Sequence, residues 1–372
     1  MYDVAIIGAG PAGSTLARLI GPRYRVLLVD RRQLDAPFRA GSLAKPCGGL
    51  LAPAAQAELA RQGLGVPASV IAGPQLFAVR ALDLVAKLER LYQRFYVNVD
   101  REAFDRWLVS LAPDCVETGF GWTLTALERD AEGPLLHFRT AEGGHASART
   151  RLVIGADGAS SLVRRLAFPT AATPRRYSAI QATFESGSSE AYYGAIFDSE
   201  STDFYGWVIP KAESVIVGAA LEPETAVWAT FDKLVERMRT AGIPLGAESG
   251  RESAMVLRPG NPWDLCPGAD SVLLAGEAAG FISPSSAEGI SYALRSAALL
   301  ASALAPGLEG AGSRYRAAAS GLALKIGVKA AKSSAIYATG ARRLIMRSGI
   351  GSIPLHEGLS FRPTFYPTRQ SS

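Results

Sequence analysis

The residues at the start of the chain have the types and the spacing of a dinucleotide site. The apolar segment Tyr2–Ile7 runs directly into a Gly-x-Gly-x-x-Gly sequence made by Gly8, Gly10 and Gly13. Gly8 permits a tight turn, Gly10 lets the backbone approach a pyrophosphate, and Gly13 lets the following helix pack close to the strand. The N-terminus of that helix would face the phosphates with free N–H groups, so the pattern predicts a pyrophosphate site.

A second apolar segment supports this interpretation. Arg25–Val29 ends in Asp30, at about the spacing where an acidic residue binds a ribose 2′-OH. Arg31 follows directly and is a further candidate for cofactor binding. A glycine motif alone is weak evidence, but together with the strand, the helix and the terminal aspartate it predicts dinucleotide binding.

Other apolar segments must position this site. Residues 152–155 and 271–276 are two further apolar stretches that end in glycine. Between them, residues 171–264 alternate between apolar and polar side chains, which predicts an inserted antiparallel sheet. Within this range, Trp228–Ala241 has the pattern of a helix. A nucleotide-binding sheet in separated pieces points to a flavin-type fold, because ordinary dehydrogenases keep this domain contiguous.

We therefore predict an α/β fold. An FAD-binding, Rossmann-like domain of the glutathione-reductase type would be interleaved with an antiparallel-sheet substrate domain and followed by C-terminal helices. The predicted ranges are 1–70, 98–170 and 265–310 for the FAD-binding domain, 71–97 and 171–264 for the substrate domain, and 311–372 for the C-terminal helical region.

Composition excludes several classes of function. The 372 residues are 48% hydrophobic, which is ample for a large core. The net charge of +5 comes from mostly scattered cations, which gives nucleic-acid binding little support. The longest apolar candidate, residues 291–306, is too short to span a bilayer and contains Arg295.

The few cysteines and histidines argue against a disulfide framework and against a metal site. Cys47, Cys115 and Cys266 are dispersed, and none of the three histidines is paired at ligand spacing. We therefore expect no metal and a reducing, cytoplasmic setting. Because the dinucleotide pattern begins at residue 2, we also expect no signal peptide.

Four motifs, in order, resemble those of p-hydroxybenzoate-hydroxylase-type FAD proteins and, within them, of the geranylgeranyl reductase-like family. The resemblance covers about residues 1–320. The motifs are the Gly8–Gly13 turn with Asp30, the segment Asp100–Asp105, the segment Gly155–Arg165, and Gly276–Gly280 followed by Pro284 and Glu288–Ile290. The resemblance implies this fold and FAD as the cofactor.

The resemblance also implies roles for individual residues. Arg101 would reach the FAD phosphates, and Arg164 and Arg165 would bind phosphate or support their turn. A helix N-terminus would meet the flavin N1–C2=O edge, where reduction places negative charge, although the same residues also suit an ordinary helix cap. The further residues carried over are Asp157, Gly158, Gly276, Glu277, Pro284, Ser286, Gly289 and Ile290.

Two further segments narrow the resemblance. Residues 45–49 are similar to the Pro-Cys-Gly-Gly loop of the geranylgeranyl reductases, in which Gly48 and Gly49 would let the loop lie against the isoalloxazine ring. Cys47 would either donate a proton to the substrate or be a buried, inert thiol. Lys45 resembles a lysine of flavin halogenases only because it lies close to this loop in the sequence, and the motif that flanks that lysine is absent here.

Residues 205–210 resemble the Tyr-x-Trp-x-Phe-Pro segment of the same family, with Ile209 in place of Phe. The segment also approaches the Trp-x-Trp-x-Ile-Pro sequence of flavin halogenases. Because Tyr205 and Trp207 alternate with Gly206, we expect them to share one face of a strand, as an aromatic wall for substrate or flavin or as a buried face.

Glu277 stands where the family usually has Asp, and Ala287 stands where Gly is usual. With Ile209, these departures indicate a divergent branch, so the substrate is not fixed by the resemblance. Glu277 keeps a carboxylate that could accept a ribityl hydroxyl.

The predicted activity is reduction of C=C bonds in an isoprenoid or other apolar substrate by hydride from reduced FAD. One alternative is an FAD-dependent monooxygenase that uses NAD(P)H and O₂ to hydroxylate an aromatic substrate, with halogenation as the less favoured reaction. Another alternative is a flavin-binding protein without turnover. The chain has no second Gly-x-Gly-x-x-Gly domain, so NAD(P)H would have to bind transiently.

The C-terminal part is rich in cations among apolar residues. Lys325, Lys329 and Lys332 fall at helical spacing and are followed by Arg342, Arg343 and Arg347. A basic amphipathic helix can lie on the inner face of an anionic membrane. The alternative is the solvated face of a covering helix, and the oligomeric state is not set by any of these patterns.

Overall fold

Strands that lie far apart in the sequence form one parallel sheet. The computed structural model describes residues 1–35, 46–186, 191–223 and 226–353. Its first sheet has the order β16, β9, β1, β2, β6 along its parallel part, which confirms that the nucleotide-binding sheet is assembled from separated pieces. The bounds are β1 Tyr2–Ile7, β2 Val26–Asp30, β6 Glu117–Phe120, β9 His145–Gly155 and β16 Val272–Leu274.

The edges of this sheet carry short antiparallel additions, and helices cover it. The first half of β9 pairs with β8, which pairs with β7, and β15 pairs with β16. Helices α1 and α6 pack against each other on the sheet. The remaining bounds in this layer are α1 Pro11–Ile20, α2 Pro53–Arg61, α3 Arg101–Ser110, β7 Thr123–Asp130, β8 Gly133–Arg139, α4 Leu162–Ala167, β15 Gly268–Ala269 and α6 Ile290–Leu304.

The second sheet is mainly antiparallel and has the order β14, β10, β13, β12, β11, β4, β5, β3. Only β11 and β4 pair in parallel in this order. Residues 1–70 contribute the short strand β3 to this sheet, where it pairs with β5. The bounds are β3 Leu50–Leu51, β4 Leu76–Asp83, β5 Leu88–Asn98, β10 Arg175–Ser186, β11 Tyr193–Phe197, β12 Gly206–Pro210, β13 Ser214–Leu221, α5 Val227–Thr240 and β14 Leu245–Arg258.

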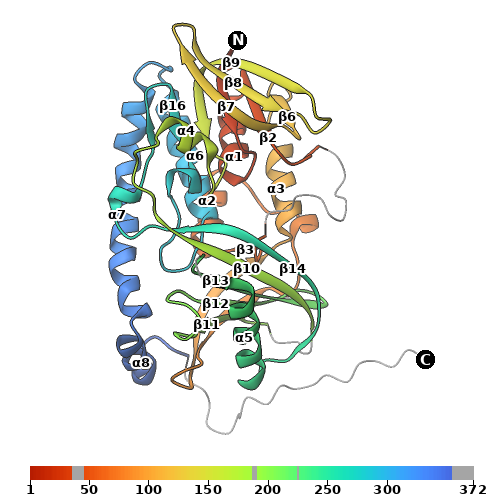
Figure 1. Cartoon of the computed structure of the whole chain (residues 1–372), viewed down its shortest axis with the longest axis vertical. Helices are drawn as coiled ribbons and strands as arrows, with labels where there is room; N and C mark the ends of the chain where they lie inside the picture. The colour runs from red at the N-terminus through yellow and green to blue at the C-terminus, as the bar shows by residue number, and fades with distance from the viewer. Residues whose placement is uncertain (36–45, 187–190, 224–225, 354–372) are drawn as a thin grey trace, which may run out of the picture.

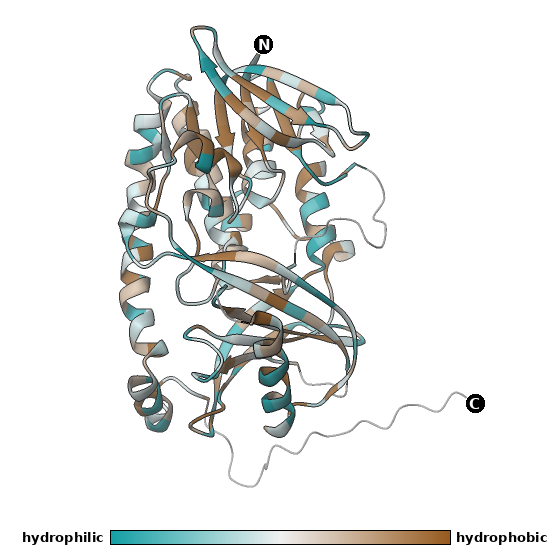
Figure 2. Cartoon of the chain, viewed as in Figure 1, coloured by the Kyte–Doolittle hydropathy of each residue, from teal (hydrophilic) through white to brown (hydrophobic). Residues whose placement is uncertain are grey.

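Apolar side chains bury the faces of both sheets. Strands β1, β2 and β16 are buried along most of their length, and Figure 2 shows the central strands of the upper layer as predominantly brown. On the second sheet, α5 buries Phe231, Leu234 and Met238 against the strands. Each sheet therefore has its own core, and the two layers meet where the candidate site lies.

Two helices complete the described chain and connect the layers. Helix α7, Ala311–Tyr337, runs along one side of the molecule past both sheets, and α8, Thr339–Ser348, lies against β5 (Figure 1). No helix in the described part of the chain is both long enough and apolar enough to cross a membrane.

The predicted basic face of the C-terminal helices is only partly present. Arg342 is 4% exposed and pairs with Asp83 of β4, with Nε 2.7 Å from Oδ2, so it belongs to the interior rather than to a solvated face. Lys329 is half-buried over the ring of Tyr292, whereas Lys325 is exposed. The helical spacing of these cations in the sequence could not show which of them is buried, because their partners lie on other elements.

The Arg342–Asp83 pair yields a stability prediction. Replacing Arg342 by Met would leave the carboxylate of Asp83 buried without its cation, which costs about 3–5 kcal/mol in comparable cases. We expect a loss of that size in the free energy of unfolding, measured by urea denaturation. The exposed Arg347→Met is the matched control and should change it by no more than about 0.5 kcal/mol. Equal losses in both variants would contradict this assignment.

Candidate flavin site

The order of the parallel strands brings three sequence motifs to one edge of the first sheet. Hydrogen bonds join the ends of neighbouring strands, from Gly8 N to Val29 O (2.7 Å), from Ala156 N to Ile7 O (2.7 Å) and from Ala275 N to Gly155 O (2.9 Å). The carboxyl ends of parallel strands form the edge at which α/β sheets bind ligands. The glycine turn, the Asp157 turn and the Gly276 turn are therefore neighbours.

Glycine at the three positions of the first turn serves different physical needs. Gly8 has φ +105°, and a Cβ atom there would lie 2.5 Å from Ala156 O. A Cβ on Gly13 would lie 1.8 Å from Gly8 O. By contrast, Gly10 has φ −75°, and a Cβ there would meet no protein atom within 4 Å. The fold thus requires Gly8 and Gly13, while Gly10 faces open space that a pyrophosphate could approach.

Two helix N-termini present free N–H groups. No side chain caps α1, its first turn has no acidic residue, and the Ala12 and Gly13 N–H groups have no partner among the described residues. The Gly289 and Ile290 N–H groups at the start of α6 are likewise unpaired within the described ranges. Such ends bind anions, so α1 suits a pyrophosphate and α6 suits the N1–C2=O edge of a reduced flavin.

A buried charge network connects Asp30 to Arg101. Asp30 accepts the Ala9 N–H at 2.7 Å and pairs with Arg32 at 3.1 Å. Arg32 also pairs with Asp105, at 2.8 Å, and Asp105 pairs with Arg101, at 2.8 Å. Burial alone would raise the pKa of Asp105, but the two guanidinium groups more than offset it and hold that pKa below its ordinary value.

Sequence reasoning had placed Arg31 at the cofactor, but its side chain is exposed, and it is Arg32 that lies inward. Asp105 was also missed as a site residue. The i, i+4 spacing of Arg101 and Asp105 was a usable signal, because such pairs meet on one helix face. Arg101 is thus held in a network beside the site rather than at a solvated helix start.

Asp157 and Arg164 hold the neighbouring turns. Asp157 accepts the Leu162 and Val163 N–H groups with one oxygen, at 2.7 and 3.2 Å, whereas its other, buried oxygen has no partner among the described residues. Gly158 permits this turn with φ +77°. Arg164 donates to Ala278 O at 3.2 Å and to other carbonyl groups, so turn support is the role that its contacts indicate.

Gly276 and Glu277 join the first sheet to the second. Gly276 has φ +58° and donates its N–H to Ser296 Oγ at 2.9 Å. Glu277 accepts the N–H of Leu257, at the end of β14, at 3.0 Å. One carboxylate oxygen of Glu277 is therefore held by the second sheet.

Side chains from the second sheet and from α7 clamp the loop before α6. Pro284 O accepts from Arg258 Nε at 3.3 Å, Ser285 O from the Tyr337 hydroxyl at 2.8 Å, and Ser286 O from the Tyr205 hydroxyl at 2.7 Å.

Ala287, where the family usually has Gly, has φ +48° and so takes the left-handed conformation that glycine favours. Arg258 and Tyr337 were missed, since only tertiary contact reveals that they hold this loop.

The Cys47 loop lies on the second sheet. A Cβ on Gly48 would lie 2.1 Å from Ile209 Cδ1, and Gly49 has φ +63° with its carbonyl bound to the Val99 N–H at 2.8 Å. The conformation of Gly49 and the nearby Val99 backbone therefore require glycine at that position, whereas Gly48 is only closely packed against the Ile209 side chain. Lys45 lies outside the described residues.

Cys47 is half-buried among cations. The Cys47 thiol lies close enough to Arg101 and Lys211 to interact with both electrostatically, and close enough to Arg101 for a hydrogen bond. Burial lowers the pKa of Lys211 to about 8, against the opposing influence of Cys47 and Asp100. Lys211 was not anticipated, although it directly follows the 205–210 segment.

Tyr205, directly before β12, and Trp207 of β12 lie on the same side of the strand, as predicted, with ring centroids 5.8 Å apart. Tyr205 is buried, and burial raises the pKa of its hydroxyl, which accepts from Tyr193 while it clamps Ser286. The Trp207 ring packs over Gly218, and its Nε1 has no hydrogen-bond partner in the described part of the chain. Within that part, no group of residues could hold a metal ion.

The residues at this edge fit FAD, with open space at Gly10 and unpaired N–H groups on α1 and α6. A family model described as an FAD binding domain matches residues 1–213. The chain belongs to this family. It is thereby an FAD-dependent oxidoreductase, and its mixed α/β fold with the curled antiparallel sheet and C-terminal helices is that of the p-hydroxybenzoate-hydroxylase-type flavoproteins.

Several known proteins resemble this family member over nearly its whole length. Protein CbrA of Escherichia coli is 41% identical over 371 residues, which cover 100% of this chain and 98% of that protein.

A geranylgeranyl bacteriochlorophyll reductase-like protein from Thermoplasma acidophilum superposes with a TM-score of 0.77 at 19% identity, covering 92% of this chain and 89% of the other. PqsL of Pseudomonas aeruginosa, a probable FAD-dependent monooxygenase, gives 0.67 at 19% identity, covering 94% and 99%.

The geometry of Gly10 makes it a clean probe of the site. Gly10→Val should fold normally, since its backbone is ordinary and the added atoms meet no protein, yet it should purify without flavin absorbance because valine fills the space that the pyrophosphate needs. Circular dichroism and the flavin spectrum measure the two effects. Gly65→Val, at an exposed loop position where a Cβ is equally free of contacts, is the control and should retain flavin. A yellow Gly10→Val protein would refute the pyrophosphate position.

Proposed function

We propose that this oxidoreductase reduces C=C bonds of an isoprenoid or another apolar substrate, with Cys47 as the proton donor. The observation that carries the proposal is the half-buried thiol next to Arg101 and Lys211, on a loop packed against the second sheet. Reduced FAD, when bound, supplies a hydride to one carbon of the double bond. The thiol gives its proton to the other carbon, and the resulting thiolate is reprotonated from solvent.

The chain supports each part of this role. Positive charges of Arg101 and Lys211 beside the sulfur stabilise the thiolate left after proton transfer. The Gly289 and Ile290 N–H groups would hold the pyrimidine edge of the flavin, because the clamped loop fixes where α6 begins. Buried rings of Tyr205 and its neighbours exclude water from this part of the second sheet.

The reductase-like protein superposes better than PqsL, with a TM-score of 0.77 against 0.67 and 0.69 for two PqsL structures. Both likenesses concern the fold, and one fold can host both reactions. As part of the same proposal, the electron donor is a transiently bound NAD(P)H.

Reaction of the reduced protein with O₂ tests this choice. The dithionite-reduced protein is mixed with oxygenated buffer in a stopped-flow spectrometer, with and without an aromatic substrate. A reductase should reoxidise slowly and directly. A transient absorbance that belongs to neither reduced nor oxidised flavin would instead favour the monooxygenase. A protein that retains FAD but is reduced by neither NADH nor NADPH would favour flavin binding without turnover.

Cys47→Ala should separate flavin chemistry from proton transfer. We expect FAD binding and flavin reduction to remain unchanged, while turnover of a geranylgeranyl substrate, followed by the mass gain of two hydrogens per double bond, falls on the order of 100-fold. The exposed Cys115 provides the control, and Cys115→Ala should leave turnover intact. Unchanged turnover in Cys47→Ala would remove this cysteine from the mechanism.

A further inference from the structure

A carboxylate lies at the start of α6, at the end of the loop that the second sheet and α7 clamp. Glu288 directly precedes Gly289 and Ile290, whose N–H groups have no partner among the described residues. Those N–H groups suit the pyrimidine edge of FAD, where reduction places negative charge. The side chain of Glu288 thus brings a negative charge to the groups that would stabilise one.

Hydrogen bonds hold this carboxylate at the helix end. Its Oε1 atom accepts the Ser291 N–H at 2.7 Å, and its Oε2 atom accepts the Ser291 hydroxyl at 2.6 Å. The backbone carbonyl of Glu288 accepts the Ser283 N–H at 3.0 Å. Because one residue of α6 engages both carboxylate oxygens, the charge cannot swing away from the first turn without the loss of two hydrogen bonds.

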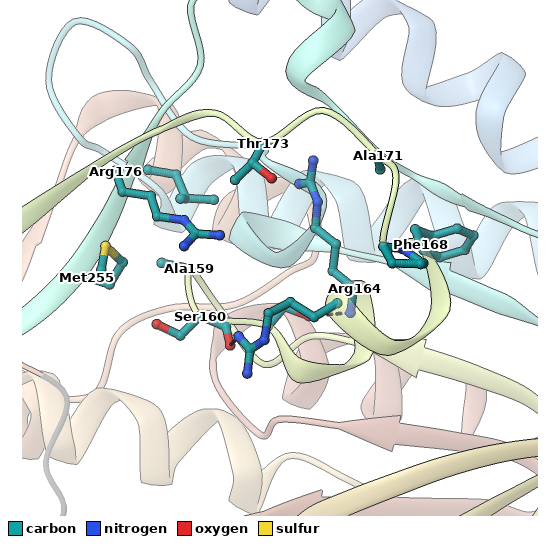
Figure 3. Close-up of a pocket in the computed structure, with 12 residues that line it drawn as sticks. Ala159, Ser160, Arg164, Phe168, Ala171, Thr173, Arg176 and Met255 are labelled. Atoms are coloured by element: carbon teal, nitrogen blue, oxygen red, sulfur yellow. Dashed lines mark hydrogen bonds between the residues drawn. The ribbon is translucent and has the colours of Figure 1, made fainter.

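No cation pairs with this carboxylate. Glu288 makes no ion pair with any residue that the structure describes. Lys329 of α7 is close enough to experience its charge, since burial lowers the pKa of Lys329 and Glu288 opposes that shift. Arg164 and Arg176 are directed elsewhere, because they line a cavity of about 360 Å³ beside α4 (Figure 3). The carboxylate therefore acts on its surroundings as a negative charge.

Buried hydroxyl groups on both layers experience this charge. Burial raises the pKa of Tyr96, Tyr205 and Tyr292, and Glu288 adds to the increase in each case. Tyr96 belongs to β5, Tyr205 directly precedes β12, and Tyr292 belongs to α6. The Tyr292 hydroxyl is buried and has no hydrogen-bond partner in the described part of the chain. Charges in such buried surroundings are screened less than charges in water.

Reduction changes the charge at the pyrimidine edge of a flavin. A hydride that arrives at N5 brings two electrons and one proton, and the negative charge then lies along N1–C2=O. A helix N-terminus stabilises that charge, whereas a carboxylate held in the same turn destabilises it by Coulomb repulsion. The two effects oppose each other, and a second proton, taken up at N1, removes the repulsion.

We propose that Glu288 lowers the midpoint potential of the bound FAD by holding a negative charge beside the pyrimidine edge of the flavin. It thereby makes reduced FAD a stronger reductant. Glu288 tunes the cofactor and carries neither the hydride nor its proton. The inference needs only the FAD chemistry of the family, so it does not depend on whether the protein is a reductase or a monooxygenase.

The test is the midpoint potential of the FAD-loaded protein, measured anaerobically by reductive titration against a reference dye. Glu288→Gln removes the charge but keeps an oxygen that can accept from Ser291. It should raise the ratio of reduced to oxidised FAD at a fixed potential on the order of tenfold, which is about 30 mV for a two-electron couple. Its affinity for oxidised FAD, which carries no charge at this edge, should change by less than about twofold.

Two further variants separate charge from packing. Glu288→Asp keeps the negative charge, and Glu309→Gln removes one from the exposed loop before α7, so both should leave the midpoint potential unchanged. The pH above which only one proton accompanies the two electrons should be lower in Glu288→Gln, because N1 then loses its proton more easily. An unchanged or lower potential in Glu288→Gln, or an equal rise in either control variant, would overturn the proposal.

Discussion

The parallel pairing of β9 between β1 and β16 is the constraint on which the rest of the structure depends. These three strands come from residues 2–7, 145–155 and 272–274, and their hydrogen bonds place three separate turns at one sheet edge. Neither the glycine turn nor the start of α6 would form a site alone, because each supplies only one end of an elongated ligand. Together they offer two helix N-termini on the same layer whose first N–H groups have no partner among the described residues, although Glu288 accepts the Ser291 N–H in the first turn of α6.

The second constraint is the attachment of this layer to the curled sheet. Glu277 binds the backbone of β14, Arg258 and Tyr205 bind the loop before α6, and Tyr337 reaches the same loop from α7. The buried Arg342–Asp83 pair fixes α8 to β4. The C-terminal helices thus belong to the framework of the candidate site. Their contacts hold the loop that contains an alanine at φ +48°.

The parts of the site that follow from local backbone rules could be predicted from the sequence. A glycine turn between a buried strand and a helix predicts close packing of the two, which Gly8 and Gly13 show, and the alternation of Tyr205 and Trp207 sets their common face. The helical pattern after Asp100 likewise predicted the helix that begins at Arg101, although the pairing of Arg101 with Asp105 was overlooked.

The rest depends on contacts between distant segments. Arg31 and Arg32 are adjacent in sequence, and only the position of Asp105 on α3 decides that Arg32 turns inward. Lys211 lies near Cys47 only because the Cys47 loop packs on β12.

The central claim is that one elongated site takes both halves of FAD, the adenosine diphosphate half at α1 and Asp30 and the flavin half at α6. Titration of the flavin-free protein with FAD and with FMN, followed by quenching of flavin fluorescence, tests it most directly. The account predicts saturation at one FAD per chain, with FMN bound at least about 100-fold more weakly because it lacks the adenosine half and the pyrophosphate. Equal affinity for FAD and FMN, or no saturable binding of either, would contradict it.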